Sequence, residues 1–142
     1  MKGVSFGSTH SYRDWGLILT DAEIGLPEVK TSTIDIPGAD GVLDLTEALD
    51  GTVHYGNREL KLTFVTTEKL CRKDWAALLS DLSTAIHGQR KSIRFDDDTA
   101  WVYQGRCYVD AFETSRWTRT VVIRCDCDPY KVGVSDSTKR SL

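Results

Sequence analysis

Apolar and polar residues alternate along most of the chain, with the period of two that is typical of half-buried β-strands. In residues 60–66, Leu60, Leu62 and Phe64 take every second position, and Lys61 and Thr63 lie between them. This alternation places the apolar side chains on one face of a sheet. Comparable patterns predict further strands at residues 4–6, 15–20, 29–36, 52–55, 91–95, 101–103, 106–114 and 118–127.

The period changes once, to that of an α-helix, between residues 73 and 87. Apolar residues recur there in the i, i+3, i+4, i+7, i+11 series of an amphipathic helix, at Trp75, Leu78, Leu79, Leu82 and Ile86. Gly88 follows, where glycine commonly ends a helix. We therefore predict one helix near residues 72–87. Many strands around one helix indicate a mainly β fold, a β-sandwich or barrel with a single flanking helix.

The densest turn chemistry lies in residues 34–49. Pro37-Gly38 suits the centre of a type II turn, because proline presets φ and glycine accepts a positive φ. Asp40-Gly41 follows at once as a second turn dipeptide. Apolar residues flank both turns, so the stretch predicts an extended arm that turns back on itself and then enters the strand system. An ordinary surface hairpin is the alternative.

Composition and charge narrow the class of protein. The chain has 142 residues, 40% of them hydrophobic, which predicts one domain over residues 1–131 followed by a polar, flexible tail over residues 132–142. Its net charge of −3, with both signs interspersed, argues against a nucleic-acid-binding surface. No apolar run is long enough for a membrane helix, so no membrane insertion is expected. No apolar segment of a secretory signal is visible at the start.

The four cysteines, Cys71, Cys107, Cys125 and Cys127, are predicted to be free thiols. Cys125 and Cys127 are two residues apart in a predicted strand, so they share a face and cannot pair easily with each other. Without a signal sequence, synthesis in a reducing cytosol is expected. A single C-x-C with no partner pair does not match the ligand spacing of a zinc site.

No catalytic constellation assembles in the sequence. His10, His54 and His87 are scattered, and the motifs of nucleophile elbows, phosphate-binding loops and zinc proteases are missing. Cys71 is better explained as a packed thiol than as an activated one. The run at residues 96–98 suits a solvated hairpin tip better than a cation site. We predict a protein that is not an enzyme and has no catalytic, cofactor or metal site.

Four stretches of the sequence together resemble a known family. They are Ile36-Pro-Gly-Ala-Asp-Gly-Val-Leu-Asp44 with the following Tyr55-Gly-Asn-Arg58; Trp75-Ala-Ala-Leu-Leu79 with Ile86-His-Gly88; Phe95-Asp-Asp-Asp98 with Tyr103-Gln-Gly-Arg106; and Cys127-Asp-Pro-Tyr-Lys131. In this order and spacing, over roughly residues 3–131, the chain resembles the N-terminal, ring-forming domain of the distal tail proteins of siphophages.

The resemblance implies a role as well as a fold. Members of that family form a ring, usually of six subunits, at the end of the tail tube of the virion. The ring joins the tube to the tail-tip or receptor-binding proteins, and DNA passes through its lumen. Larger relatives carry a second, galectin-like domain, which is not expected here because the chain ends soon after Tyr130. The implied setting is a phage or prophage tail, made in the bacterial host cytoplasm.

A ring subunit has to cover the sheet edges and apolar residues that it presents to its neighbours. The arm is the segment best suited to that task. The predicted subunit-interface residues are Val29, Ile34, Ile36, Pro37, Gly38, Asp40, Gly41 and Val42.

Three other classes remain as alternatives. A tail-tube or tail-adaptor protein would have the same sandwich. A carbohydrate-binding module could use the four tryptophans, but Trp15 and Trp75 lie in apolar series that suit a core. For the third class, an enzyme, the sequence offers no constellation of catalytic residues.

Overall fold

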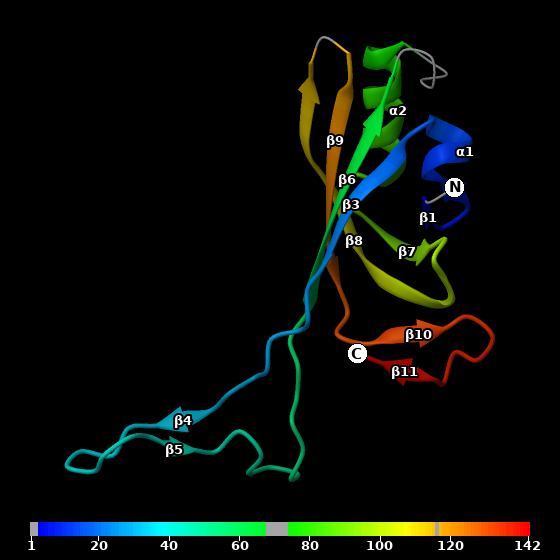
Figure 1. Ribbon diagram of the computed structural model, residues 1–142. Coiled ribbons are helices and arrows are strands. Elements are labelled where there is room, and N and C mark those ends of the chain that lie inside the picture. Colours follow the sequence, from blue (N-terminus) through cyan, green and yellow to red (C-terminus); the bar gives the residue numbers. More distant parts are fainter. Residues whose placement is uncertain (1–2, 68–73, 116) are drawn as a thin grey trace.

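The computed structural model of the chain describes residues 3–67, 74–115 and 117–142. One large antiparallel sheet and two helices form the body, and a long arm extends from it (Figure 1). The elements are, in order, β1 (Val4–Phe6), β2 (Thr9–His10), α1 (Ser11–Trp15), β3 (Ile18–Ile24), β4 (Thr33–Ile34), β5 (Leu43–Asp44), β6 (Arg58–Thr66), α2 (Trp75–Ile86), β7 (Gln89–Phe95), β8 (Asp98–Thr114), β9 (Arg119–Cys127), β10 (Lys131–Gly133) and β11 (Arg140–Ser141). The predicted mainly β fold with one long flanking helix is confirmed.

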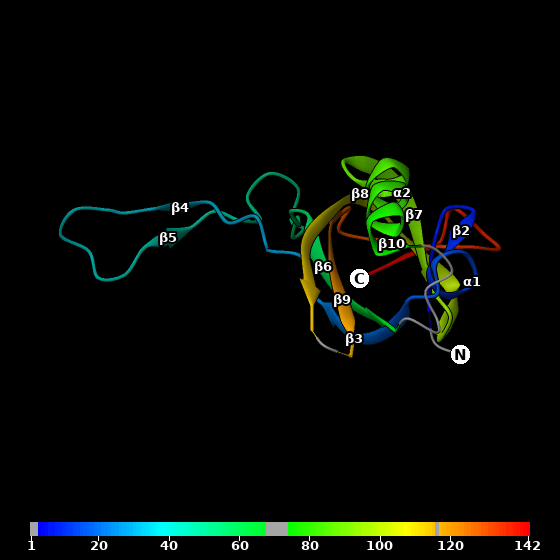
Figure 2. The same cartoon turned by 90° about the horizontal axis from the view of Figure 1, so that it is seen from above.

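The sheet folds over on itself. Its strand order is β2-β1-β7-β8-β9-β6-β3, so three strands separate β1 from β6. In a flat sheet these two strands would lie about 19 Å apart, because neighbouring strands are about 4.8 Å apart. The ring centroids of Phe6 in β1 and Phe64 in β6 are only 6.3 Å apart. The two ends of the sheet therefore face each other across a shared core, as in a sandwich, and Figure 2 shows β6 and β7 on opposite sides of the body.

The fold-over depends on β8, the longest strand. Residues 98–107 of β8 pair with β7, and residues 105–114 pair with β9. At the changeover, a Cβ on Gly105 would lie 2.5 Å from both the carbonyl oxygen of Asp126 and Sγ of Cys127. Only glycine allows the backbones to approach so closely. The prediction of two separate strands, at 101–103 and 106–114, is therefore wrong, because Gly105 continues the strand instead of ending it.

Helix α2 covers the core with the predicted stripe. Leu78, Leu82 and Ile86 are buried, at intervals of four residues, and Trp75 packs edge-on against Phe112 of β8 at a centroid distance of 6.2 Å. The helix bounds confirm the prediction within the described residues; residues 72 and 73 lie outside them. Gly88 has the positive φ of 73° expected after a helix end.

The short helix α1 replaces the start of a predicted strand. Residues 15–20 were expected to be extended, but Trp15 ends α1, and β3 begins only at Ile18. The imidazole Nδ1 of His10 accepts hydrogen bonds from the backbone N–H groups of Tyr12 and Arg13 and so caps the helix. Gly16, at φ 69°, then ends it. Trp15 and Leu17 are buried nonetheless, so the apolar series correctly marked core positions but not their backbone conformation.

The C-terminal segment forms a hairpin against the body. Val132 of β10 pairs with Val102 of β8, and Arg140 of β11 pairs with Val132. These two short strands were not foreseen in the predicted tail of residues 132–142. The flexibility of that segment stays a prediction.

Three cysteines lie in the core, and Cys71 is outside the described residues. Cys107 and Cys125 are directly opposite each other in β8 and β9, with the Cys125 thiol donating to Cys107 Sγ at 3.6 Å. All three described cysteines are free and buried. That hydrogen bond, and burial, raise the pKa of Cys125 well above its ordinary value. Burial raises the pKa of Cys127 to about 12. Thiols that stay protonated are poor nucleophiles, so Cys125 and Cys127 act as core residues.

Thiol titration is expected to give four reactive groups per chain after denaturation without reductant, since the described sulfur atoms are not bonded to each other. In the folded protein, the three core thiols should react far more slowly than free cysteine, because they are buried. A reduced and denatured sample serves as the control. Two or fewer reactive groups in the unreduced sample would contradict the prediction.

Candidate functional site

The arm comprises residues 25–57 and is an insertion between two adjacent strands. Ile24, at the end of β3, pairs with Leu60 of β6, so the chain leaves the sheet and returns to it at neighbouring points. Between these points the arm projects well beyond the body (Figures 1 and 2). Every residue from 28 to 44 is exposed.

A buried arginine holds the root of the arm. Arg58, the first residue of β6, donates from Nε to the carbonyl oxygen of Gly25 at 2.9 Å and from Nη1 to that of Pro129 at 3.4 Å. Its guanidinium also lies 5.3 Å from the ring centroid of Tyr103. The two carbonyls and the aromatic face compensate for burying the charge. Sequence analysis placed Arg58 in the motif Tyr55-Gly-Asn-Arg58 but did not identify this contact.

Beyond the root, few backbone hydrogen bonds join the two sides of the arm. Gly56 N–H donates to the Glu28 carbonyl at 2.7 Å, and Lys30 N–H donates to the His54 carbonyl at 2.8 Å. The predicted strand at residues 52–55 is wrong: the segment is turn and coil, with one isolated β-bridge from Tyr55 to Val29. The predicted strand at residues 29–36 is also too long: β4 is the strand in this range, and Val29 forms only the isolated bridge. The arm has no neighbouring strand of the body to pair with, so its ladder is short.

The tip of the arm has the turns expected from its sequence. The backbone N–H of Ala39 donates to the Ile36 carbonyl at 3.1 Å, which encloses Pro37 and Gly38 in a four-residue turn. Gly38 has φ 82° and Gly41 has φ 71°, values that side-chain-bearing residues rarely adopt. The predicted extended arm that turns back on itself is confirmed.

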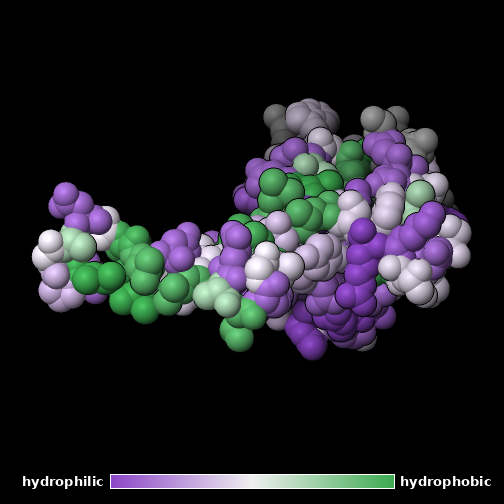
Figure 3. Space-filling view, turned by 90° about the horizontal axis from the view of Figure 1, so that it is seen from below, coloured by the Kyte–Doolittle hydropathy of each residue, from purple (hydrophilic) through white to green (hydrophobic). Residues whose placement is uncertain are grey.

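The arm carries most of the exposed apolar surface. Of the thirteen large hydrophobic residues that are exposed in the described chain, nine lie in residues 24–53: Ile24, Leu26, Val29, Ile34, Ile36, Val42, Leu43, Leu49 and Val53. Figure 3 shows hydrophobic surface along the arm. Leu49, 99% exposed, and Leu26, 76% exposed, have almost no cover. An unpartnered apolar surface of this kind marks an interaction site.

The predicted interface residues all lie in this exposed region. Val29, Ile34, Ile36 and Val42 are exposed apolar side chains, and Pro37, Gly38, Asp40 and Gly41 form the tip. Leu26, Leu43 and Leu49 were missed. They could have been found in the sequence as apolar residues that lie between two predicted strands and have no alternating segment to pair with.

Register divides the tip into two faces. Ile34 pairs with Leu43, and Thr33 pairs with Asp44. Since successive side chains on a strand point to opposite faces, Ile34 and its partner Leu43 share one face. Thr33 and Asp44 lie on the other face. The tip is therefore an amphipathic ribbon.

Two aspartate–threonine pairs lie on the side of the arm that returns to the body. Hydrogen bonds from the hydroxyl and N–H of Thr46 lower the pKa of Asp44, and those from Thr52, followed by one from His54, lower the pKa of Asp50. Folded-state pKa values below the unfolded ones mean that these bonds stabilise the loop at neutral pH and are lost in acid. They are local and leave the apolar residues uncovered.

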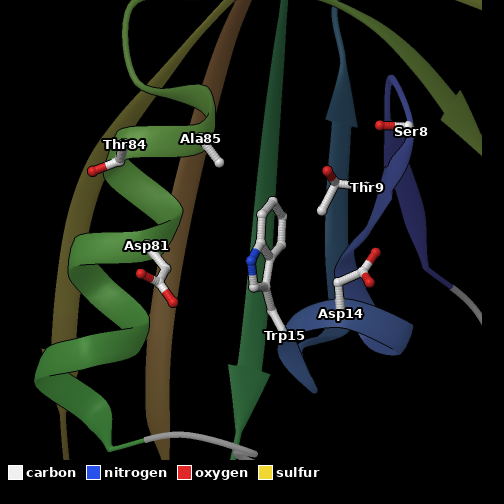
Figure 4. Close-up of a pocket in the computed structure, with 7 residues that line it drawn as sticks. All are labelled: Ser8, Thr9, Asp14, Trp15, Asp81, Thr84 and Ala85. Atoms are coloured by element: carbon white, nitrogen blue, oxygen red, sulfur yellow. The ribbon is translucent and has the colours of Figure 1, made fainter.

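A concavity lies between α1 and α2, with a volume of about 480 Å3 (Figure 4). Ser8, Thr9, Asp14, Asp81 and Thr84 contribute polar side chains to it. Trp15 also lines it but is only 5% exposed. A sugar-binding platform needs an accessible aromatic face, which Trp15 does not offer. This concavity gives no support to the carbohydrate-binding alternative.

The described residues hold no group of three His, Cys, Asp or Glu side chains that could bind a metal ion. The Nε2 atom of His10 contacts Asp96 at 2.9 Å, while its Nδ1 caps α1. Asp96, in the tip run of residues 96–98, thus accepts a hydrogen bond from His10 in the body. No helix among the described residues is long and apolar enough to span a membrane.

The fold is similar to that of a solved phage protein. The crystal structure of SPP1 Dit, described as a paradigm of the hub adsorption apparatus in phages that infect Gram-positive bacteria, superposes with a TM-score of 0.70 at 18% sequence identity. The match covers 94% of this chain and 52% of that chain, so this chain spans about half the length of SPP1 Dit. No family model matches the sequence, and no curated protein sequence matches it. The fold expected from the resemblance to distal tail proteins is confirmed.

Proposed function

We propose that the protein is a structural component of a phage or prophage tail. In this proposal it forms a closed ring, a hexamer, at the distal end of the tail tube, and joins the tube to the tail-tip or receptor-binding proteins. Its partners are other copies of itself, the tail-tube protein and the tip proteins, with DNA passing through the lumen. It has no catalytic role.

The exposed apolar arm carries the proposal. A free-standing arm with eight exposed large hydrophobic residues needs a partner surface. The arm projects from a body with the fold of SPP1 Dit. An arm on one side of a subunit that binds another side of the next is a heterologous contact, and repeated heterologous contacts make a ring when the rotation between subunits closes. A tail-tube or tail-adaptor role would use the same contact at another position in the particle.

The mass of the oligomer and the position of the protein in the tail particle test this function. Light scattering over a concentration series is expected to show a species six times the mass of the chain, and negative-stain images of it should show closed rings. Gold-labelled antibody should mark the tip end of isolated tails. A monomer at the highest concentration, together with labelling along the tube or none at all, would contradict the hub role.

A further inference from the structure

The arm has a strong excess of negative charge. In residues 25–57, Lys30 is the single lysine or arginine, set against six acidic residues: Glu28, Asp35, Asp40, Asp44, Glu47 and Asp50. Asp44 and Asp50 are engaged by neighbouring threonines. Asp35 and Asp40, near the tip, form no ion pair or side-chain hydrogen bond with any residue that the structure describes. The tip therefore presents two uncompensated carboxylates that are close in the sequence to its apolar residues.

The C-terminal hairpin has the opposite charge. Residues 131–142 contain Lys131, Lys139 and Arg140 against Asp136. Lys131 lies 3.7 Å from a carboxylate oxygen of Asp98. Lys139 and Arg140 have no acidic partner within the described part of the chain. This hairpin therefore presents two uncompensated cations.

The hairpin also offers apolar surface. Outside residues 24–53, the described chain has only four exposed large hydrophobic residues, in two places. Phe112 and Trp117 lie near the β8–β9 turn, and Val134 and Leu142 lie in the C-terminal hairpin. Within the described part of the chain, the second place combines exposed apolar side chains with uncompensated cations.

The positions of the two elements fit a head-to-tail contact. Figure 1 shows the arm and the β10–β11 hairpin near the same end of the body, extending to opposite sides of it, with the β8–β9 turn at the other end. Figure 2 again places the arm on one side and β10 away from it. A second copy displaced along the arm brings its C-terminal hairpin toward the arm of the first.

We infer that the arm of one subunit docks on the C-terminal hairpin of a second copy, with Ile34, Ile36 and Leu43 packing toward Val134 and Leu142. Asp35 and Asp40 then lie near Lys139 and Arg140. Opposite charges at the rim of an apolar contact fix its register and partner. The inference rests on the proposed function, because it identifies the surface that receives the arm in the ring.

Charge exchange tests the docking. The arm variant D35K/D40K and the hairpin variant K139E/R140E each place like charges at the contact. Each is expected to raise the midpoint concentration of oligomer dissociation about tenfold or more, measured by sedimentation velocity. The quadruple variant, which carries both changes in one chain, restores opposite charges and is expected to return the midpoint to within about threefold of the unchanged protein.

The quadruple variant is its own control, because it contains every substitution of the two defective variants. If the effects of the two defective variants on the dissociation midpoint simply add in the quadruple variant, the inference is wrong. Deleting residues 34–42 separates the two proposals. If deletion abolishes the oligomer but the charge exchange gives no rescue, the arm binds elsewhere on its neighbour, and only the docking surface is wrong. An oligomer that survives the deletion contradicts the arm contact on which the ring proposal rests.

Discussion

Replacing Leu82 with aspartate is expected to destabilise the protein severely at 25 °C. Leu82 is fully buried at the centre of the α2 stripe, between Leu78 and Ile86. An isolated carboxylate there would lose its hydration without gaining a partner, at a cost of at least about 4 kcal/mol in the free energy of unfolding. A domain of this kind is stable by about 5–15 kcal/mol in total. Urea denaturation followed by circular dichroism measures the loss.

The matched control is Ser80→Asp, two residues away on the same helix. Ser80 is exposed, so the introduced carboxylate stays in water and the free energy of unfolding is expected to change by less than about 0.5 kcal/mol. Similar losses in the two variants would show that the buried face of α2 has been assigned wrongly.

Deleting residues 34–42 is expected to yield a folded monomer. The deletion removes Ile34, Ile36 and Val42 together with both tip turns, and every residue in it is exposed. None of these side chains contributes to the core, so the midpoint of thermal unfolding should change little. The oligomer should be lost, because the largest exposed apolar ribbon has gone. Light scattering and circular dichroism on the same samples measure the two effects.

The substitution Thr33→Ser serves as the control for the arm deletion. Thr33 lies on the polar face of the tip, opposite the face of Ile34, and the change should leave the mass unaltered. A deletion variant that loses its circular dichroism signal would show that the arm stabilises the body, which its exposure does not predict.

The sequence predicted those elements whose stability comes from a regular apolar period. The alternation of Leu60, Leu62 and Phe64 marks β6, and the spacing of Leu78 and Leu82 marks α2. These patterns act through local geometry and burial, which single-sequence analysis captures well.

Features that depend on distant contacts were missed. The continuity of β8 rests on Gly105 passing close to Asp126 and Cys127. The hairpin of β10 and β11 rests on pairing with Val102. Both contacts join residues that are far apart in the sequence. At the arm, Pro37 and Gly38 predicted the turn. That the body leaves the arm uncovered depends on the packing of distant strands, which the sequence does not show.

The insertion of the arm between adjacent strands bears on how such a protein can vary. β3 and β6 pair directly at Ile24 and Leu60. For the folding of the body, the arm is therefore a loop whose two ends are held together by the sheet. The entropy of closing a loop grows slowly with its length, by about 0.6 kcal/mol for each doubling. Residues can therefore be added to or removed from the arm at small cost to the core. The reach of one subunit toward the next, and hence the diameter and curvature of an assembly, can change while the folding of the body stays the same.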